Sequence, residues 1–148
     1  MPSSLSLSFS ELTQEDVPRI LPLVSALNEG RIDEAILSER LTAMWGENYT
    51  CMGCFDRDKL IGVAGLWLQT RHYVGKSCEL DHVYLLPAYR GKGVGEKFMD
   101  FIHQWTKEKG CQSTELYAYV TNPKSHKFYF NQGYAVLGFH FQRKIDHE

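Results

Sequence analysis

The chain has 148 residues and a mass of 17.0 kDa, and 43% of its residues are hydrophobic and 13% aromatic. This length fits one domain, and this hydrophobic fraction fills a core, so wholesale disorder is excluded. The formal net charge of -2 at pH 7 and the pI near 6.3 argue against a global basic field for nucleic acid or an anionic membrane.

Hydrophobic periodicity predicts the elements of the first third of the chain. Apolar residues alternate with serines over 5–9, which predicts a strand with one buried face. A helix is expected from the hydroxyl cap Thr13 to about residue 28, and Pro22 should kink it or shift its start. A second helix is expected over about 32–45, because apolar residues recur there at helical spacing and Gly46 follows.

The rest of the chain alternates strands and helices. The expected strands cover about 49–55, 59–69, 77–86, 114–120, 134–137 and 139–144. The clearest helix covers about 93–109, and a last one follows the cap Asn122 and Pro123 and ends at Gly133. The order β-α-α-β-β-β-α-β-α-β-β predicts a mixed α/β (α+β) fold in a single domain, 1–148. The strand–helix–strand unit over 77–120 should be a right-handed parallel crossover.

Four cysteines are present, and two of them form the pair Cys51-Met52-Gly53-Cys54. This spacing resembles a metal or redox pair, but it has no second Cys-x-x-Cys partner and lies in an expected strand. Side chains at i and i+3 of a strand point to opposite faces, so the two sulfurs should diverge. Structural thiols are therefore favoured over a zinc site, and no metal is expected.

We expect neither a membrane span nor a secretion signal. The longest uncharged apolar run, Leu60–Thr70, is too short to cross a hydrocarbon core of roughly 30 Å as a helix. No basic residue precedes Arg19, and no apolar signal-type segment follows Met1. The expected location is the cytoplasm, with no membrane and no nucleic acid as partners.

The segment Arg90-Gly91-Lys92-Gly93-Val94-Gly95 joins an expected strand to an expected helix. Its glycines let the backbone approach a ligand closely, and the free N–H groups of a first helical turn suit phosphate oxygens. Taken alone, it could also be a glycine-rich connection. A Rossmann fingerprint would need glycine where Glu96 stands, and a P-loop would need Ser or Thr where Gly93 stands.

In this context the chain resembles the GNAT superfamily of acetyl-CoA-dependent N-acetyltransferases. Residues 79–95 are similar to that family's fourth strand and pyrophosphate loop. Residues 122–134 are similar to its Asn-x-x-Ala-x-x-Phe-Tyr-x-x-x-Gly-Phe block, although Ser125 replaces the usual Ala and Phe130 a common acidic residue. The resemblance is strong over about 77–134. It implies a central mixed, mostly antiparallel twisted sheet of about seven strands flanked by four helices.

The resemblance also implies how acetyl-CoA is held. Its pyrophosphate would lie on the backbone amides of Arg90, Gly91, Lys92, Gly93, Val94 and Gly95. Its pantetheine arm would lie along Val83, Tyr84 and Leu85, in a slot opened by the splaying of two strands. A backbone N–H near Leu85 would polarise the thioester carbonyl. Asn122 would bond the cofactor arm, cap the last helix, or do both.

The resemblance implies a general acid and leaves the base open. Tyr129 is the expected acid for the leaving thiolate, against the alternative of a half-buried Tyr in an aromatic stripe. Glu79 stands where some members carry a general-base glutamate, although a salt-bridged or solvated Glu is an equal alternative. His82 and Tyr84 have the opposite strand parity, so only one set faces the slot unless a bulge intervenes. Asp81 acting through water, or ordered water alone, are further alternatives.

The expected function is acetyl transfer from acetyl-CoA to a primary amine of a small molecule, by direct attack in a ternary complex. Acetylation of a protein lysine or N-terminus is the alternative among enzymes. A CoA-binding sensor without turnover is the alternative of another class. A homodimer is plausible in this family, but no residue here demands one.

Overall fold

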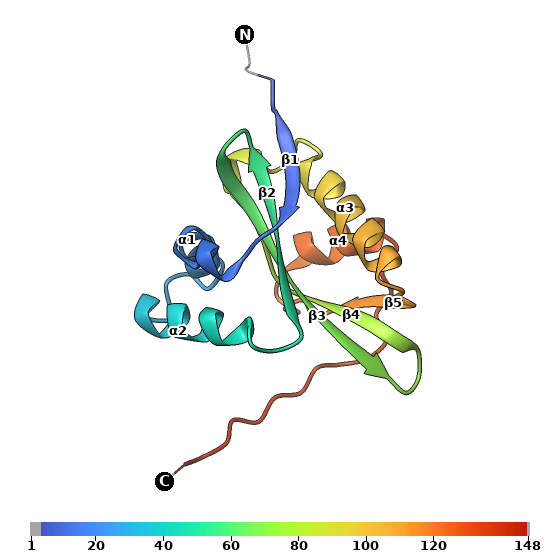
Figure 1. Cartoon of the computed structure of the whole chain (residues 1–148). Helices are drawn as coiled ribbons and strands as arrows, with labels where there is room; N and C mark the ends of the chain where they lie inside the picture. The colour runs from blue at the N-terminus through green and yellow to red at the C-terminus, as the bar shows by residue number, and fades with distance from the viewer. Residues whose placement is uncertain (1–3, 148) are drawn as a thin grey trace. The chain divides into compact units, whose positions relative to one another are not determined.

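The computed structural model describes residues 4–147 and contains five strands and four α-helices in that range (Figure 1). The strands are β1 (Leu7–Glu11), β2 (Tyr49–Asp56), β3 (Lys59–Arg71), β4 (Gly75–Leu85) and β5 (Ser113–Leu116). The helices are α1 (Val17–Leu27), α2 (Glu34–Met44), α3 (Val94–Glu108) and α4 (Pro123–Asn131), with short 3-10 turns at Gln14–Asp16 and Pro87–Tyr89.

The chain divides into two compact units, one up to Leu116 and one from Tyr117 onward. The first unit holds the whole sheet with α1, α2 and α3, and the second holds α4. The single-domain organisation expected from the sequence stays a prediction. Within residues 4–147, no helix combines the length and hydropathy that crossing a bilayer requires.

The sheet has the order β1-β2-β3-β4-β5. Its first four strands pair antiparallel, and β4 pairs with β5 in parallel, with α3 as the connecting helix. The mixed, mostly antiparallel sheet and the parallel crossover are therefore confirmed. Figure 1 shows α1 and α2 on one side of this sheet and α3 on the other.

Two strands expected near the C-terminus, over 134–137 and 139–144, are absent from the described structure, where residues 134–147 are irregular. The expectation of about seven strands was wrong in this respect. Alternating apolar residues show only that a segment is compatible with a strand, whereas a strand forms when another supplies its hydrogen bonds. Leu137, Phe139 and Phe141 instead expose more than 80% of their surface.

The two faces of the sheet carry different side chains. We call the side covered by α1 and α2 the α1 face, and its buried core includes Cys51 beside side chains from both helices. On the other side, Phe9 stacks on Phe98 and Phe101 of α3, with ring centroids 5.8 and 5.4 Å apart. Cys54 pairs with Phe9 across the β1–β2 ladder. The two sulfurs therefore lie on opposite faces, as the spacing predicts, and both are free thiols.

Candidate active site

A β-bulge interrupts the ladder between β3 and β4. Gly65 pairs with Asp81 and Val63 pairs with Tyr84, so β4 holds one more residue than β3 between these pairs. His82 lies in this interval with a φ of 33°, in the left-handed region that most residues avoid. A bulge of this kind reverses the alternation of side chains beyond it.

The bulge brings onto one face residues that strict alternation would separate. Glu79 pairs with Trp67, and Trp67 and Tyr84 both pack against the buried core of the α1 face. Directly paired residues share a face of the sheet, so Glu79 and Tyr84 both belong to the α1 face. The sequence allowed this only if a bulge intervened, and the structure shows that it does.

His82 is held by the hydroxyl of Tyr49. The Tyr49 Oη and His82 Nε2 atoms lie 2.5 Å apart, and the Tyr49 ring contacts the Trp45 and Trp67 rings at centroid distances of 5.1 and 5.0 Å. Burial lowers the pKa of His82, and the neighbouring Asp81 carboxylate partly opposes that shift. Burial raises the pKa of Tyr49, so this phenol stays protonated.

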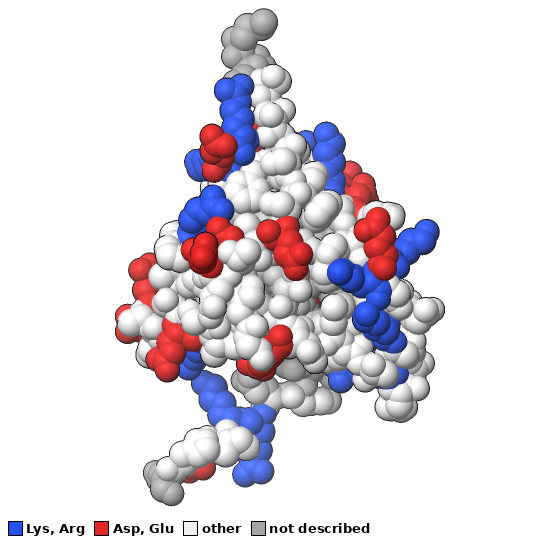
Figure 2. Space-filling view, viewed as in Figure 1, with Lys and Arg blue, Asp and Glu red and all other residues white. Residues whose placement is uncertain are grey.

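Further along β4, one guanidinium lies between two carboxylates. Arg71 Nη2 is 4.0 Å from Glu79 Oε1, and Arg71 Nε is 4.0 Å from Glu115 Oε2. Glu79 and Glu115 pair directly across the parallel ladder, and the Tyr73 hydroxyl donates a 2.6 Å hydrogen bond to Glu115. With Asp81 two residues beyond Glu79, this region carries three carboxylates and one cation. Figure 2 shows both signs of charge interspersed over the visible face of the molecule.

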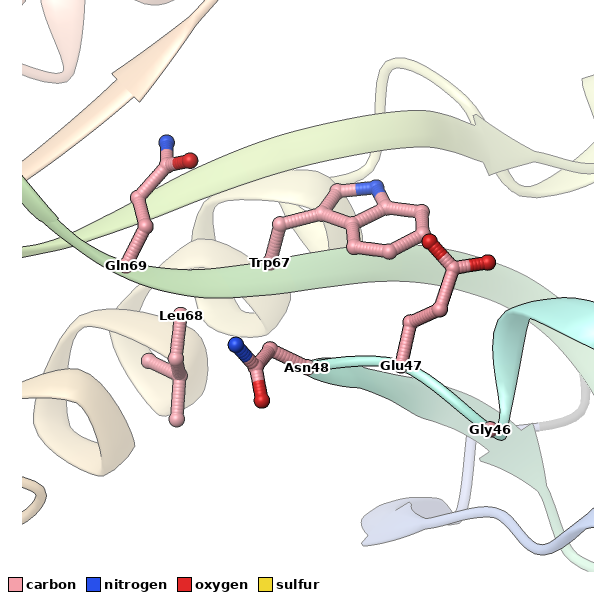
Figure 3. A pocket seen from close by; sticks show the side chains of 6 residues that line it. All are labelled: Gly46, Glu47, Asn48, Trp67, Leu68 and Gln69. Atoms are coloured by element: carbon pink, nitrogen blue, oxygen red, sulfur yellow. The ribbon is translucent and has the colours of Figure 1, made fainter.

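An open pocket of about 470 Å³ adjoins these carboxylates (Figure 3). Its lining residues come from the turn before β2 and from β3, namely Gly46, Glu47, Asn48, Trp67, Leu68 and Gln69. Figure 3 shows Glu47 and Trp67 among the side chains that line this pocket. Trp67 also donates from Nε1 to Asp81 Oδ2 at 3.1 Å and pairs with Glu79, so it links the pocket to the carboxylates of β4.

Only part of the β4 edge that faces β5 is paired with that strand. The ladder pairs Ser77–Leu80 of β4 with Ser113–Leu116 of β5, and β4 continues to Leu85 without a β5 partner in the described residues. Val83, Tyr84 and Leu85, the residues expected to hold the pantetheine arm, lie in this unpaired part. An unpaired strand edge offers backbone donors and acceptors to an extended ligand.

The glycine-rich loop turns into α3 through two glycines in the left-handed region. Gly91 and Gly93 have φ values of 73° and 78°, and α3 begins at Val94. The first-turn amides of a helix have no partner within the helix, so they are available to phosphate oxygens. Arg90 turns back onto β4, where its Nε donates to the Leu85 carbonyl at 2.8 Å. Lys92 is exposed at the rim.

Asn122 and Tyr129 lie in the second unit. The Asn122 side chain accepts a 3.3 Å hydrogen bond from the Ser125 amide, so its expected role as the cap of α4 is confirmed. The Tyr129 ring makes edge contacts with Phe128 and Tyr134. Burial, with a smaller contribution from Tyr134, raises the pKa of Tyr129 to about 12.

The sequence did not indicate Tyr49, Glu47 or Glu115 as site residues. Each lies in or beside a strand, where tyrosine and glutamate are unremarkable. Their place in the site depends on the register of β2 and β5 against their neighbours. No local pattern reports that register.

Comparison with known proteins identifies the family. Residues 20–134 match the family described as Acetyltransferase (GNAT) family. Aminoalkylphosphonate N-acetyltransferase of Salmonella typhimurium is 22% identical over 135 residues, covering 90% of this chain and 88% of that protein.

Two solved structures share the fold. Aminoglycoside N-acetyltransferase AAC(6')-Iy in complex with CoA has a TM-score of 0.83 at 16% identity, over 97% of this chain and 98% of that one. Ribosomal-protein-alanine N-acetyltransferase from Brucella melitensis has a TM-score of 0.81 at 17% identity, over 95% of this chain and 100% of that one. The chain therefore belongs to the GNAT family of acetyltransferases and is an acyltransferase.

Proposed function

We propose that the enzyme transfers the acetyl group of acetyl-CoA to a primary amine of a small cationic molecule, by direct attack in a ternary complex. The observation that carries this proposal is the arrangement along β4 within the first unit. Beyond Leu80, one edge of the strand has no strand partner among the described residues and can take an extended ligand, and the α1 face beside it carries carboxylates around an aromatic ring.

The proposed acetyl-CoA site combines the loop and the free edge of β4. The pyrophosphate would bind the amides of the loop, the residues being Arg90, Gly91, Lys92, Gly93, Val94 and Gly95. The pantetheine arm would pair with the backbone of Val83, Tyr84 and Leu85 as an added strand. Asn122 is a further proposed contact. An N–H near Leu85 would hold the oxyanion of the tetrahedral intermediate.

The proposed acceptor site lies around Trp67. Its ring can bind an ammonium group through a cation–π contact, and Glu47, Glu79 and Asp81 supply negative charge nearby. Two relatives are named for small amine-bearing acceptors, an aminoalkylphosphonate and an aminoglycoside. The carboxylates favour a cationic amine over a neutral acceptor, and both names favour a small acceptor molecule.

The proposed acid–base pair is Tyr129 and Glu79. An alkyl ammonium, whose pKa in water is about 10.4, must lose a proton before it attacks, and Glu79 would take that proton. Only about a quarter of the Glu79 side chain surface is exposed, so it can pass the proton onward to solvent. Tyr129, whose pKa of about 12 keeps it protonated at neutral pH, would donate to the leaving thiolate.

The test is release of free thiol from acetyl-CoA against a panel of small amines, a lysine-containing peptide and a peptide with a free N-terminus. Turnover with a small di- or polyamine supports the proposal, and turnover with peptides alone overturns its acceptor class. Binding of CoA by calorimetry without thiol release for any acceptor favours a sensor. The cytoplasmic location and the homodimer stay predictions.

Substitutions test the assigned roles. Tyr129→Phe should lower kcat about 100-fold with little change in acetyl-CoA affinity, because it removes only the donated proton. Tyr119→Phe is the matched control, since Tyr119 lies in the same unit with 84% of its surface exposed. Equal losses of kcat and affinity in Tyr129→Phe would contradict the acid assignment.

A further inference from the structure

We propose that His82 accepts the second proton of the amine, the one released after the new carbon–nitrogen bond has formed. This inference rests on the proposed function. It adds a residue to the reaction and leaves Glu79 and Tyr129 in the roles proposed above.

The need for a second acceptor follows from counting protons. An ammonium group carries three protons and the product amide nitrogen carries one, so two must leave. The first leaves before attack, to Glu79. The neutral amine then bonds to the thioester carbon, the π electron pair of the carbonyl moves onto its oxygen until collapse restores the double bond, and the nitrogen becomes positively charged. As the intermediate collapses, the carbon–sulfur bond breaks, sulfur keeps the electron pair and takes the proton of Tyr129, and the nitrogen gives up its second proton.

His82 has a nitrogen that lacks a hydrogen-bond partner among the described residues. Among the described residues its Nδ1 atom makes no hydrogen bond, although it is shielded from solvent, whereas Nε2 contacts the Tyr49 hydroxyl. With the ring proton on Nε2, donated to Tyr49 Oη, Nδ1 presents a lone pair. A shielded nitrogen without a partner costs free energy, so such atoms in native proteins ordinarily meet water or a ligand.

The position of His82 fits this role. It directly precedes Val83, the first residue of the proposed pantetheine strand, and lies two residues beyond Leu80, the last β4 residue paired with β5. Its φ of 33° is a strained conformation for a non-glycine residue, and such strain gathers at functional sites. Gly65 of β3 makes room for the ring, because a Cβ at that position would overlap the imidazole.

The surroundings keep His82 neutral before the reaction and stabilise its protonated form once it has accepted the proton. Burial holds its pKa below the usual 6.5, so Nδ1 is unprotonated at pH 7 and ready to accept. The titratable groups around it are Tyr49 and Cys51 of β2 and the adjacent Asp81. The Asp81 carboxylate favours the imidazolium that forms. From β3 come Gly65 and Trp67, and α1 buries only apolar side chains.

The experiment measures kcat from pH 5 to 8 at saturating acetyl-CoA and amine. His82→Asn keeps a residue that tolerates positive φ but removes the proton acceptor. We expect kcat at pH 7.5 to fall about 100-fold with acetyl-CoA affinity by calorimetry unchanged. In the wild type, kcat should fall towards low pH, and we call this fall the acid limb of the profile. The acid limb should vanish in His82→Asn and persist in Glu79→Gln. His147→Asn, in the exposed C-terminal segment, is the control and should match the wild type.

Tyr49→Phe provides a second test that leaves the imidazole in place. Losing the Tyr49 hydroxyl frees Nε2, so the acid limb should shift and kcat should fall severalfold. Unchanged kcat in His82→Asn, or a retained acid limb in that variant, overturns the inference. If His82→Asn does not bind acetyl-CoA, the test rests on Tyr49→Phe. An acid limb of kcat at the same pH in Tyr49→Phe and the wild type would then overturn the inference. Wild-type enzyme that releases no thiol with any amine would instead refute the proposed function itself.

Discussion

The two halves of β4 behave differently although they form one continuous strand. Over Ser77–Leu80 the strand is hydrogen-bonded between β3 and β5, and three of these four residues are buried. Over 81–85 it pairs only with β3 among the described residues and contains the bulge at His82, and each residue keeps some exposed surface although the His82 Nδ1 atom is shielded. The first half holds the sheet together, and the second leaves backbone groups and side chains available to ligands.

The physical cause of this difference is how the backbone hydrogen bonds are satisfied. A strand paired on both sides has no donors or acceptors left for a ligand. A strand paired on one side keeps a row of them, and an extended ligand can complete the ladder. We therefore expect substitutions in the first half to change stability, and substitutions around the second half to change binding and turnover.

The largest effect should come from Leu80→Ala. Leu80 is 4% exposed in the first half, so truncation should lower the free energy of unfolding by about 2–5 kcal/mol. Leu85→Ala, in the partly exposed second half, should cost less than half as much. Urea denaturation measures both, and equal losses would contradict the contrast between the halves.

Gly93→Ala should combine a loss of stability with a loss of binding. At a φ of 78°, a Cβ costs roughly 1–2 kcal/mol, and acetyl-CoA affinity should also fall severalfold because the loop amides are displaced. Gly110→Ala is the matched control, since Gly110 has a φ of 81° beyond the other end of α3. It should lose similar stability and no affinity. Denaturation and calorimetry together separate the two effects.

Gly65→Ala should reduce turnover by about fivefold, or about 1 kcal/mol. The new methyl group would overlap the His82 imidazole and push it from its place in the second half of β4. Gly138→Ala is a control with open space around its Cβ and should be neutral. Steady-state kinetics measures kcat for both variants. An unchanged kcat for Gly65→Ala would show that turnover does not depend on the position of His82.

The smallest effect concerns stability against pH. The folded pKa of His82 lies below 6.5, so below pH 6.5 the unfolded chain binds a proton that the folded chain does not. Stability should therefore decline as pH falls below 6.5. His82→Asn should remove part of this decline, less than about 1 kcal/mol between pH 7 and 6. Urea denaturation at several pH values tests it. A burial-lowered pKa at His103 leaves a residual slope in both proteins.

Local sequence patterns predicted most of the helices and strands. The spacing of apolar residues predicted the helix over 93–109, and α3 spans Val94–Glu108. The glycines singled out in the loop include Gly91 and Gly93, which adopt left-handed φ values, and their role in binding phosphate stays a prediction. The same reasoning failed over 134–144, where alternation suggested strands and the described structure has none.

The sequence by itself therefore determined the order of helices and strands up to α4, the glycine-rich turn before α3, and the divergence of Cys51 and Cys54. Only the tertiary structure decided that β4 bulges at His82, that Tyr49 reaches that histidine, and that Glu79 faces both Arg71 and Glu115. The reason is that capping, turn conformation and periodicity act between residues close in the chain. Register and bulges depend on which residues of distant strands lie opposite each other, and that choice is made by the packing of the whole sheet.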